Sequence, residues 1–165
     1  MQDVRFLPLV PSTLPTLTTL SRSHGNVSHH IQVSLHPKIN HSNFRVYSGF
    51  GQQLGPIVLF NAAGAIDGLG AIYPKTVTRL FQLVSKRPAD EATLEEARKL
   101  QWIVSSAEEF IVKNGILGIR EAIVRVLEIG NLEGGRLPLR GKMAEGEWEK
   151  WAPVMNQIGE TEKAL

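Results

Sequence analysis

Apolar residues recur every three or four positions through most of the second half of the chain, which predicts helices there. One long helix is predicted to begin at Thr93, because Glu96 follows three residues later as in a capping box, and to end at Gly115. Two shorter apolar stripes predict helices over 119–127 and 148–158. The second half is therefore expected to be helical, with a Gly/Pro-rich loop over 131–142 between the last two helices.

The first half mixes helical and strand patterns. Helical spacing predicts helices over 24–35 and 54–60 and a third that begins at Pro74. Residues 44–48 alternate apolar and polar side chains, which indicates a strand, and residues 62–73 are small and apolar with three glycines, as in a buried parallel strand. Alternating strands and helices predict a parallel α/β arrangement followed by a helical part.

The first 23 residues fit neither pattern. Three prolines and a Ser/Thr-rich stretch interrupt both periodicities, so residues 1–23 are predicted to be a disordered or aberrant N-terminus. The segment is also poor in acids, as mitochondrial transit peptides are, but it has few arginines and its prolines would disrupt an amphipathic helix.

The amino-acid composition excludes several kinds of site and classes of protein. The chain has 165 residues, of which 42% are hydrophobic, which is enough for one domain with its own core. The absence of cysteine excludes disulfides, thiolate zinc sites and a cysteine nucleophile. No apolar run is long enough for a membrane-spanning helix, so no membrane partner is expected. A cytoplasmic protein is expected, with the mitochondrion as the alternative.

Charge is divided unevenly along the chain. Residues 1–87 carry eight Lys/Arg and two Asp/Glu, whereas residues 88–165 carry ten and fourteen. A basic half can indicate nucleic-acid binding, but these charges are scattered singly, so a solvated surface without a nucleic-acid partner is expected. The five histidines lie in the first part without ligand spacing to carboxylates, so no metal is expected. They are His24, His29, His30, His36 and His41.

Four short segments stand out along the chain, namely His24-Gly-Asn-Val27, Phe44-Arg-Val-Tyr-Ser-Gly49, Gly64-Ala-Ile-Asp-Gly68 with Tyr73-Pro74-Lys75, and Gly134-Gly-Arg-Leu-Pro-Leu139. Taken in order, they resemble the dihydrodipicolinate synthase / N-acetylneuraminate lyase family. Among these lysine-dependent (class I) pyruvate aldolases, the chain looks closest to fungal members related to 4-hydroxy-2-oxoglutarate aldolase and deoxy-hexulosonate aldolase. The resemblance runs from about residue 21 to residue 158.

This resemblance implies the C-terminal part of a (β/α)8 barrel followed by a three-helix extension. A complete barrel needs ~250 residues. Residues 24–90 are then expected to form the partial barrel, with its seventh and eighth strands and a poorly patterned sixth. Residues 91–165 are expected to form the helical extension.

The resemblance also implies a mechanism, in which a lysine amine attacks the ketone of pyruvate. The resulting Schiff base stabilises a carbanion while the adjacent carbon–carbon bond forms or breaks. The position expected for this lysine falls on Ser21, next to Arg22. Serine cannot form a Schiff base and arginine stays protonated, so no catalytic residue is assigned. No separate cofactor is implied.

What remains of the implied pocket is one wall. Gly51 and Gln52 stand where sialic-acid lyases carry acidic residues, and Gly68 stands where they carry a polar one, which argues against sialic acid as substrate. The glycines of residues 64–70 could equally serve tight packing alone. The implied substrate-binding residues are Ser48, Gly49, Ile66 and Gly68.

Three further residues could take part in chemistry. Asp67 is a lone acid in an apolar run and is expected to serve a helix or loop rather than act as a base. Lys38 and Lys75 could replace the missing nucleophile, but each lies beside a proline at a predicted turn or helix start and is expected to be solvated.

Two functions remain open from sequence. The first is a carbon–carbon lyase or dehydratase that acts on 2-oxo acids such as pyruvate adducts, inactive as written because the lysine is missing. The second is a non-catalytic truncated remnant or accessory subunit that associates with an intact barrel homologue. In either case an incomplete barrel exposes an unpaired strand edge, so homo-oligomerisation or association with a homologue is expected.

Overall fold

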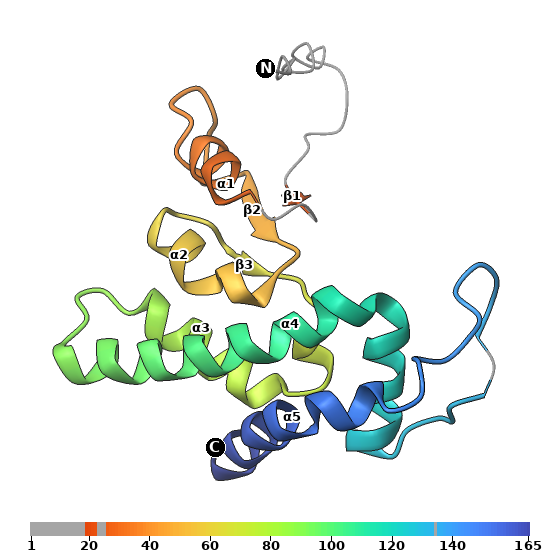
Figure 1. Ribbon diagram of the computed structural model, residues 1–165. Coiled ribbons are helices and arrows are strands. Elements are labelled where there is room, and N and C mark those ends of the chain that lie inside the picture. The colour runs from red at the N-terminus through yellow and green to blue at the C-terminus, as the bar shows by residue number, and fades with distance from the viewer. Residues whose placement is uncertain (1–18, 23–25, 134) are drawn as a thin grey trace.

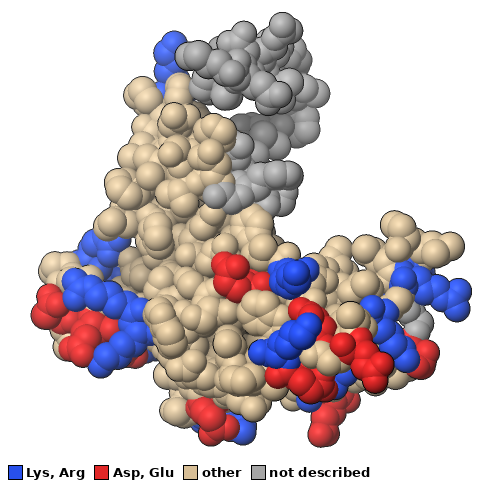
Figure 2. All heavy atoms as spheres, in the orientation of Figure 1, with Lys and Arg blue, Asp and Glu red and all other residues tan. Residues whose placement is uncertain are grey.

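The computed structural model describes residues 19–22, 26–133 and 135–165. A small parallel sheet and its covering helices lie at one end, and a larger helical part lies at the other (Figure 1). Lys, Arg, Asp and Glu side chains mingle over the helical part, whereas the face over α1 and β2 carries almost none (Figure 2). No helix among the described residues is long and apolar enough to cross a membrane.

The sheet has three parallel strands in the order β1-β2-β3, namely Thr19–Arg22, Arg45–Ser48 and Gly64–Ala65. Thr19 lies opposite Arg45, and Tyr47 lies opposite Gly64. Helices connect the strands, as parallel pairing requires. The arrangement therefore agrees with the predicted parallel α/β class.

Two strand predictions need correction. Residues 19–22 form β1 although 1–23 were expected to lack structure; pairing with the well-patterned β2 forms a strand where local preference is weak. Residues 1–18 and 23 lie outside the described residues. The strand expected over 62–73 is only Gly64–Ala65, because Asp67 Oδ1 accepts the Gly70 N–H at 2.8 Å and turns the chain into a 3₁₀ helix.

Helices cover the sheet and lead into the second half. The side chain of Asn26 caps the first of them by accepting the His29 N–H at 3.0 Å. The helix that follows β3 begins at Pro74, as predicted. In chain order the elements are α1 (Val27–Ser34), η1 (Gly51–Gln53), α2 (Leu54–Leu59), η2 (Leu69–Ala71) and α3 (Pro74–Ser85).

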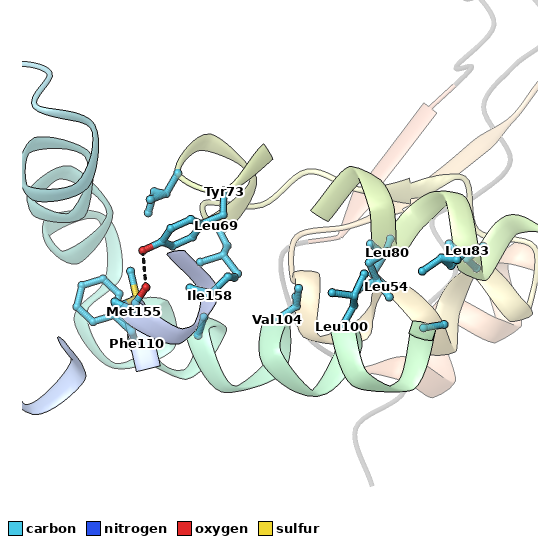
Figure 3. Close-up of a cluster of buried hydrophobic side chains, with 14 of the residues drawn as sticks. Leu54, Leu69, Tyr73, Leu80, Leu83, Leu100, Val104, Phe110, Met155 and Ile158 are labelled. Carbon is cyan, nitrogen blue, oxygen red and sulfur yellow. Dashed lines mark hydrogen bonds between the residues drawn. The ribbon is translucent and has the colours of Figure 1, made fainter. Parts of the chain in front are cut away.

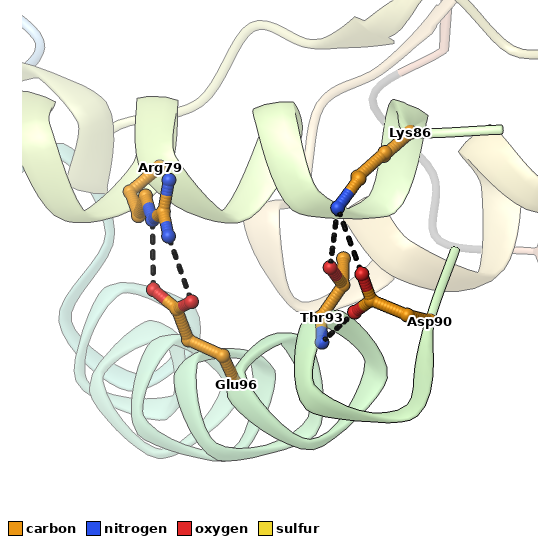
Figure 4. A network of polar contacts seen from close by, with 5 residues as sticks. All are labelled: Arg79, Lys86, Asp90, Thr93 and Glu96. Carbon is orange, nitrogen blue, oxygen red and sulfur yellow. Dashed lines mark hydrogen bonds and ion pairs between the residues drawn. The ribbon is translucent and has the colours of Figure 1, made fainter. Parts of the chain in front are cut away.

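Helix α4 (Glu91–Leu127) begins two residues before Thr93, the predicted cap. Its N-cap is Asp90, whose carboxylate accepts the Thr93 N–H at 2.8 Å. Lys86 on the preceding turn donates to both Asp90 and Thr93, and Glu96 accepts two hydrogen bonds from Arg79 of α3 (Figure 4). The predicted Thr93–Glu96 capping box is wrong because both side chains bind α3 and the turn after it instead.

The break predicted near Asn114-Gly115 is confirmed as a kink within α4. Gly115 has φ 57° and ψ −147°, a conformation that glycine adopts without a Cβ penalty. After the kink, the second arm of α4 turns back toward helix α5 (Glu147–Ala164) (Figure 1).

One apolar core joins these elements. Leu54 of α2, Leu80 of α3 and Leu100 and Val104 of α4 are buried against each other at the junction of the three helices (Figure 3). Farther along α4, buried residues of α5 close the core, and the Tyr73 hydroxyl donates to the Met155 carbonyl at 2.9 Å. The helices of the second half are therefore packed on the sheet and its covering helices rather than separate from them.

Candidate functional site

The carboxyl ends of the three parallel strands lie at one edge of the sheet. Ser21 is paired with Tyr47, and Arg22 is paired with Ser48. Ser48 is in turn paired with Ala65 at the end of β3. The turns that carry Gly49 and Ile66 leave the sheet at this same edge, which in parallel α/β folds is the edge where ligands bind.

Ser48 uses its polar atoms to hold the two turns together. Its buried hydroxyl donates to Gln53 Oε1 at 2.9 Å and accepts the Phe50 N–H at 3.1 Å. Its carbonyl accepts the Ile66 N–H at 2.8 Å. In this structure the Ser48 side chain therefore serves the turn 49–53, and the half-buried Gly49 is the part of that turn nearest the edge.

Ile66 and Gly68 leave the sheet in different environments. The Ile66 side chain is 63% exposed at the strand end. Gly68 lies against α4, where a Cβ would stand 2.4 Å from Ile119 Cδ1 and 2.8 Å from Ile119 Cγ1. The missing side chain of Gly68 thus has a packing reason, whatever else this position contacts.

Gln101 of α4 anchors the turn after β2. Its Nε2 donates to the carbonyl oxygens of Gly51 at 3.2 Å and Gln52 at 3.3 Å, and its Oε1 accepts the Gly55 N–H at 2.7 Å. One side chain of the helical extension therefore satisfies three backbone groups of η1 and the start of α2.

Two carboxylates lie below the same turn. A Cβ on Gly51 would stand 2.3 Å from Asp67 Oδ2 and 3.1 Å from Glu108 Oε1, so the glycine leaves the space that both acids occupy. Burial, and then the Asp67 charge, raises the pKa of Glu108 to about 8, while the Leu69 N–H opposes this shift. Burial also raises the pKa of Asp67, and the Gly70 N–H opposes it.

Sequence reasoning identified Asp67 but missed Glu108. A signal was present: Glu108 falls on the apolar stripe of α4, four residues after Val104, and is only 1% exposed. A carboxylate on the buried face of an amphipathic helix is costly unless it is paired with another group or protonated, so such a residue marks a candidate polar site.

The alternative nucleophiles do not lie on the strands. Lys38 is exposed in the turn after α1, where its backbone N–H donates to His36 Nδ1 at 3.3 Å. Lys75 is exposed in the first turn of α3, and its backbone N–H donates to Glu162 of α5 at 2.9 Å. Among the described residues, no group of three or more His, Asp or Glu could hold a metal ion; His24 lies outside them.

No protein-family model matches the chain. The fold, however, is similar to solved structures of dihydrodipicolinate synthase-family proteins and an aldolase. Dihydrodipicolinate synthase from Aquifex aeolicus matches with a TM-score of 0.70 and 18% identity, over 86% of this chain and 45% of that one. YagE, an Escherichia coli prophage protein of the dihydrodipicolinic acid synthase family solved with pyruvate, matches with a TM-score of 0.68 and 18% identity, over 86% and 46%.

An engineered variant of Sulfolobus solfataricus 2-keto-3-deoxygluconate aldolase matches with a TM-score of 0.66 and 17% identity, over 87% of this chain and 46% of that one. The chain thus spans about half the length of the solved structures it matches. At these identities the likeness is one of fold, and the fold is that of dihydrodipicolinate synthase-like barrels.

Proposed function

We propose that this chain is the C-terminal half of a class I pyruvate aldolase barrel, with strands β1, β2 and β3 as the sixth, seventh and eighth strands of that barrel. In this reading its ligand is a 2-oxo acid such as pyruvate, 4-hydroxy-2-oxoglutarate or a 2-keto-3-deoxy sugar acid. The observation that carries the proposal is the parallel register, which brings Ser21, Gly49 and Ile66 to one edge in the order that the resemblance implies.

The chemistry of such a site needs an amine on the sixth strand, and β1 carries Ser21 and Arg22 there. Neither can form a Schiff base with a ketone. The chain therefore keeps one wall of the pocket without the nucleophile, and by itself it is inactive as a lyase. The Gly49 backbone and the Ile66 carbonyl are the groups that would contact a 2-oxo acid, since the Ile66 N–H is bound to the Ser48 carbonyl. Ser48 holds the turn after β2, and Gly68 packs against α4.

Borohydride trapping tests this proposal directly. The purified chain is incubated with pyruvate and sodium borohydride and then weighed by mass spectrometry, with an intact pyruvate aldolase as the positive control. An unchanged mass is expected. A pyruvyl increment that maps to Lys38 or Lys75 would contradict the loss of chemistry, since it would reveal a relocated nucleophile.

A Ser21→Lys variant tests the strand correspondence, with Arg22→Lys as the matched control one residue along β1. Successive residues of a strand point to opposite faces, so only one of the two amines can reach the pocket. An adduct confined to position 21 is expected. An adduct confined to position 22, or equal labelling of both variants, would place the sixth-strand nucleophile elsewhere and sink the correspondence.

A second function is favoured by the sheet edges. Within the described residues, β1 and β3 pair on one side only, and a hollow of about 220 Å³ beside β3 is lined by apolar residues that include Tyr47, Val77 and Phe81. Such surfaces fit an accessory subunit that associates with an intact barrel homologue. Co-expression with a tagged homologue tests this role: a stable complex supports it, and separate elution of the two chains contradicts it.

A further inference from the structure

Asp67 and Glu108 come from different parts of the fold to one buried point. Asp67 lies in the turn between β3 and η2, and Glu108 lies on the first arm of α4. Both side chains approach the Cα of Gly51, where Asp67 Oδ2 would be 2.3 Å and Glu108 Oε1 3.1 Å from a Cβ. The turn after β2, the turn after β3 and α4 therefore meet at two carboxyl groups.

Among the residues that the structure describes, no positive charge compensates this meeting point. Asp67 Oδ1 accepts the Gly70 N–H at 2.8 Å, but Asp67 Oδ2 and both Glu108 oxygens are buried without a hydrogen bond of normal geometry to the described residues. The other charged group that acts on Glu108 is Glu109 of the same helix, which is also acidic. Gln52 of η1, next to Gly51, is neutral, and its Oε1 is also buried without a hydrogen bond to the described residues.

We propose that Asp67 and Glu108 share one proton and that this acid–carboxylate pair latches the turns 49–53 and 66–71 onto α4. Two adjacent buried carboxylates cannot both stay ionised at low cost. One proton replaces their repulsion by an O–H···O⁻ hydrogen bond, which is among the stronger hydrogen bonds in proteins. Glu108 carries the proton, because its burial and the neighbouring Asp67 charge outweigh the opposing Leu69 N–H, whereas Asp67 Oδ1 accepts the Gly70 N–H at 2.8 Å.

Loss of the proton leaves two negative charges that push the turns away from α4. Because these turns carry Gly49 and Ile66, the latch controls the shape of the substrate-side edge. That last consequence rests on the proposed function, but the latch itself does not, and it is tested without any substrate.

The experiment measures the unfolding equilibrium of the whole chain by urea denaturation between about pH 5 and pH 9. An acid whose folded-state pKa is raised binds its proton more tightly in the folded state. The protonated Glu108 therefore stabilises the folded state fully when the pH is below 4.5, the ordinary pKa of a glutamic acid. This stabilisation is lost as the pH rises toward about 8, the raised pKa in the folded state. The unfolding constant should rise by up to about tenfold per pH unit within this window.

Variants test whether the pH dependence of the unfolding constant comes from Asp67 and Glu108. Glu108→Gln, which imitates the protonated acid, should remove this slope, and Glu109→Gln, its neighbour on α4, should retain it. Asp67→Asn should move the window to lower pH, because burial alone would then raise the Glu108 pKa, without the added effect of the Asp67 charge. A slope that persists unchanged in Glu108→Gln would overturn the proposal.

Two further readouts keep the test decisive if Glu108→Gln does not fold. The infrared carbonyl band of a protonated carboxylic acid should be present in the native chain at pH 7 and disappear above about pH 9. Hydrogen exchange of the amides in 51–53 and 69–71, corrected for its intrinsic pH dependence, should accelerate over the same range. A missing band would overturn the shared proton, and unchanged exchange would overturn the latch.

Discussion

At the scale of single residues, glycines mark where the helical extension touches the strand-end turns. Gly51 leaves room for the carboxylates of Asp67 and Glu108, and Gly68 leaves room for Ile119. Gly68 has a φ of −76°, which any residue can adopt, so its requirement is one of space and not of backbone conformation.

We predict that Gly68→Ala destabilises the chain through this contact. The added methyl would stand 2.4 Å from Ile119 Cδ1, and such overpacking costs about 1–3 kcal/mol. Ile119→Val removes that terminal methyl and should restore part of the loss in the double variant. Urea denaturation of the four proteins in this mutant cycle measures the coupling, and additive losses would show that the two residues do not meet.

Glu162 of α5 is the second residue that joins distant segments. Its carboxylate accepts the Lys75 N–H at 2.9 Å and the Thr76 N–H at 2.7 Å, and it also accepts the Thr76 hydroxyl at 2.8 Å. These are free donors at the first turn of α3, so Glu162 caps that helix from another element.

Glu162→Ala is expected to lower the free energy of unfolding by about 1–2 kcal/mol, as the loss of a helix cap does. Glu160→Ala is the matched control, since Glu160 pairs only with Lys163 at the surface. Chemical denaturation compares the two. Equal losses in both variants would mean that the cap contributes no more than a surface charge.

At the scale of elements, the start of α4 depends on Asp90. Hydrogen bonds from the Thr93 side chain and backbone, together with Lys86, lower the pKa of Asp90 to about 2. A depressed pKa means that this contribution is present above the ordinary value of 3.8 and is lost as the pH falls toward 2.

We therefore predict that Asp90→Ala lowers the melting temperature by a few degrees at neutral pH. Asp90→Asn should lower the melting temperature much less, because asparagine is an equally good N-cap. The difference between the native chain and Asp90→Asn should shrink below about pH 3, where the native carboxylate becomes protonated. Thermal unfolding followed by circular dichroism measures both effects. A melting temperature unchanged in Asp90→Ala would show that α4 does not need this cap.

The helices and their order were predictable from sequence because their apolar stripes face one core. Even the kink was marked by Gly115. The start of α4 was predicted wrongly because Thr93 and Asp90 are both good caps, and only the tertiary contacts of Lys86 and Glu96 decide between them.

The strands were harder to predict than the helices. β1 becomes a strand through its partner β2, which no local pattern shows, and β3 ends early because one Asp side chain turns the chain. Of the site, the residues at the sheet edge were named from sequence, but the link from α4 through Gln101 and Glu108 was not. Long-range contacts of polar residues on a helix leave only a faint signal in its periodicity.

At the scale of the whole molecule, the sheet has open edges among the described residues. The strands β1 and β3 have free outer sides among the described residues, and Leu59 and Ile66 are each more than 60% exposed beside the sheet. Exposed apolar side chains next to an unpaired strand favour association of copies.

We predict concentration-dependent self-association that Ile66→Lys weakens, because a charge beside the β3 edge opposes pairing there. Leu137→Lys is the control, since Leu137 is 82% exposed on the loop between α4 and α5, and this loop projects away from the sheet (Figure 1). Sedimentation equilibrium should show at least a severalfold weaker association for Ile66→Lys only. A monomeric native chain, or equal effects of both substitutions, would contradict this account of the sheet edge.

The aromatic cluster where α4 meets α5 gives the molecule a built-in optical probe. The ring of Phe110 packs edge-on against two indoles of α5, with 5.7 Å between ring centroids for Trp148 and 6.0 Å for Trp151. Trp102 of α4, by contrast, is 60% exposed. Iodide should thus quench Trp102 selectively, and the residual emission would come from the two half-buried indoles on α5. A red shift of that residual emission at a lower temperature than global unfolding would show that α5 separates from α4 first. Tryptophan fluorescence can therefore distinguish local opening of α5 from global unfolding of the chain.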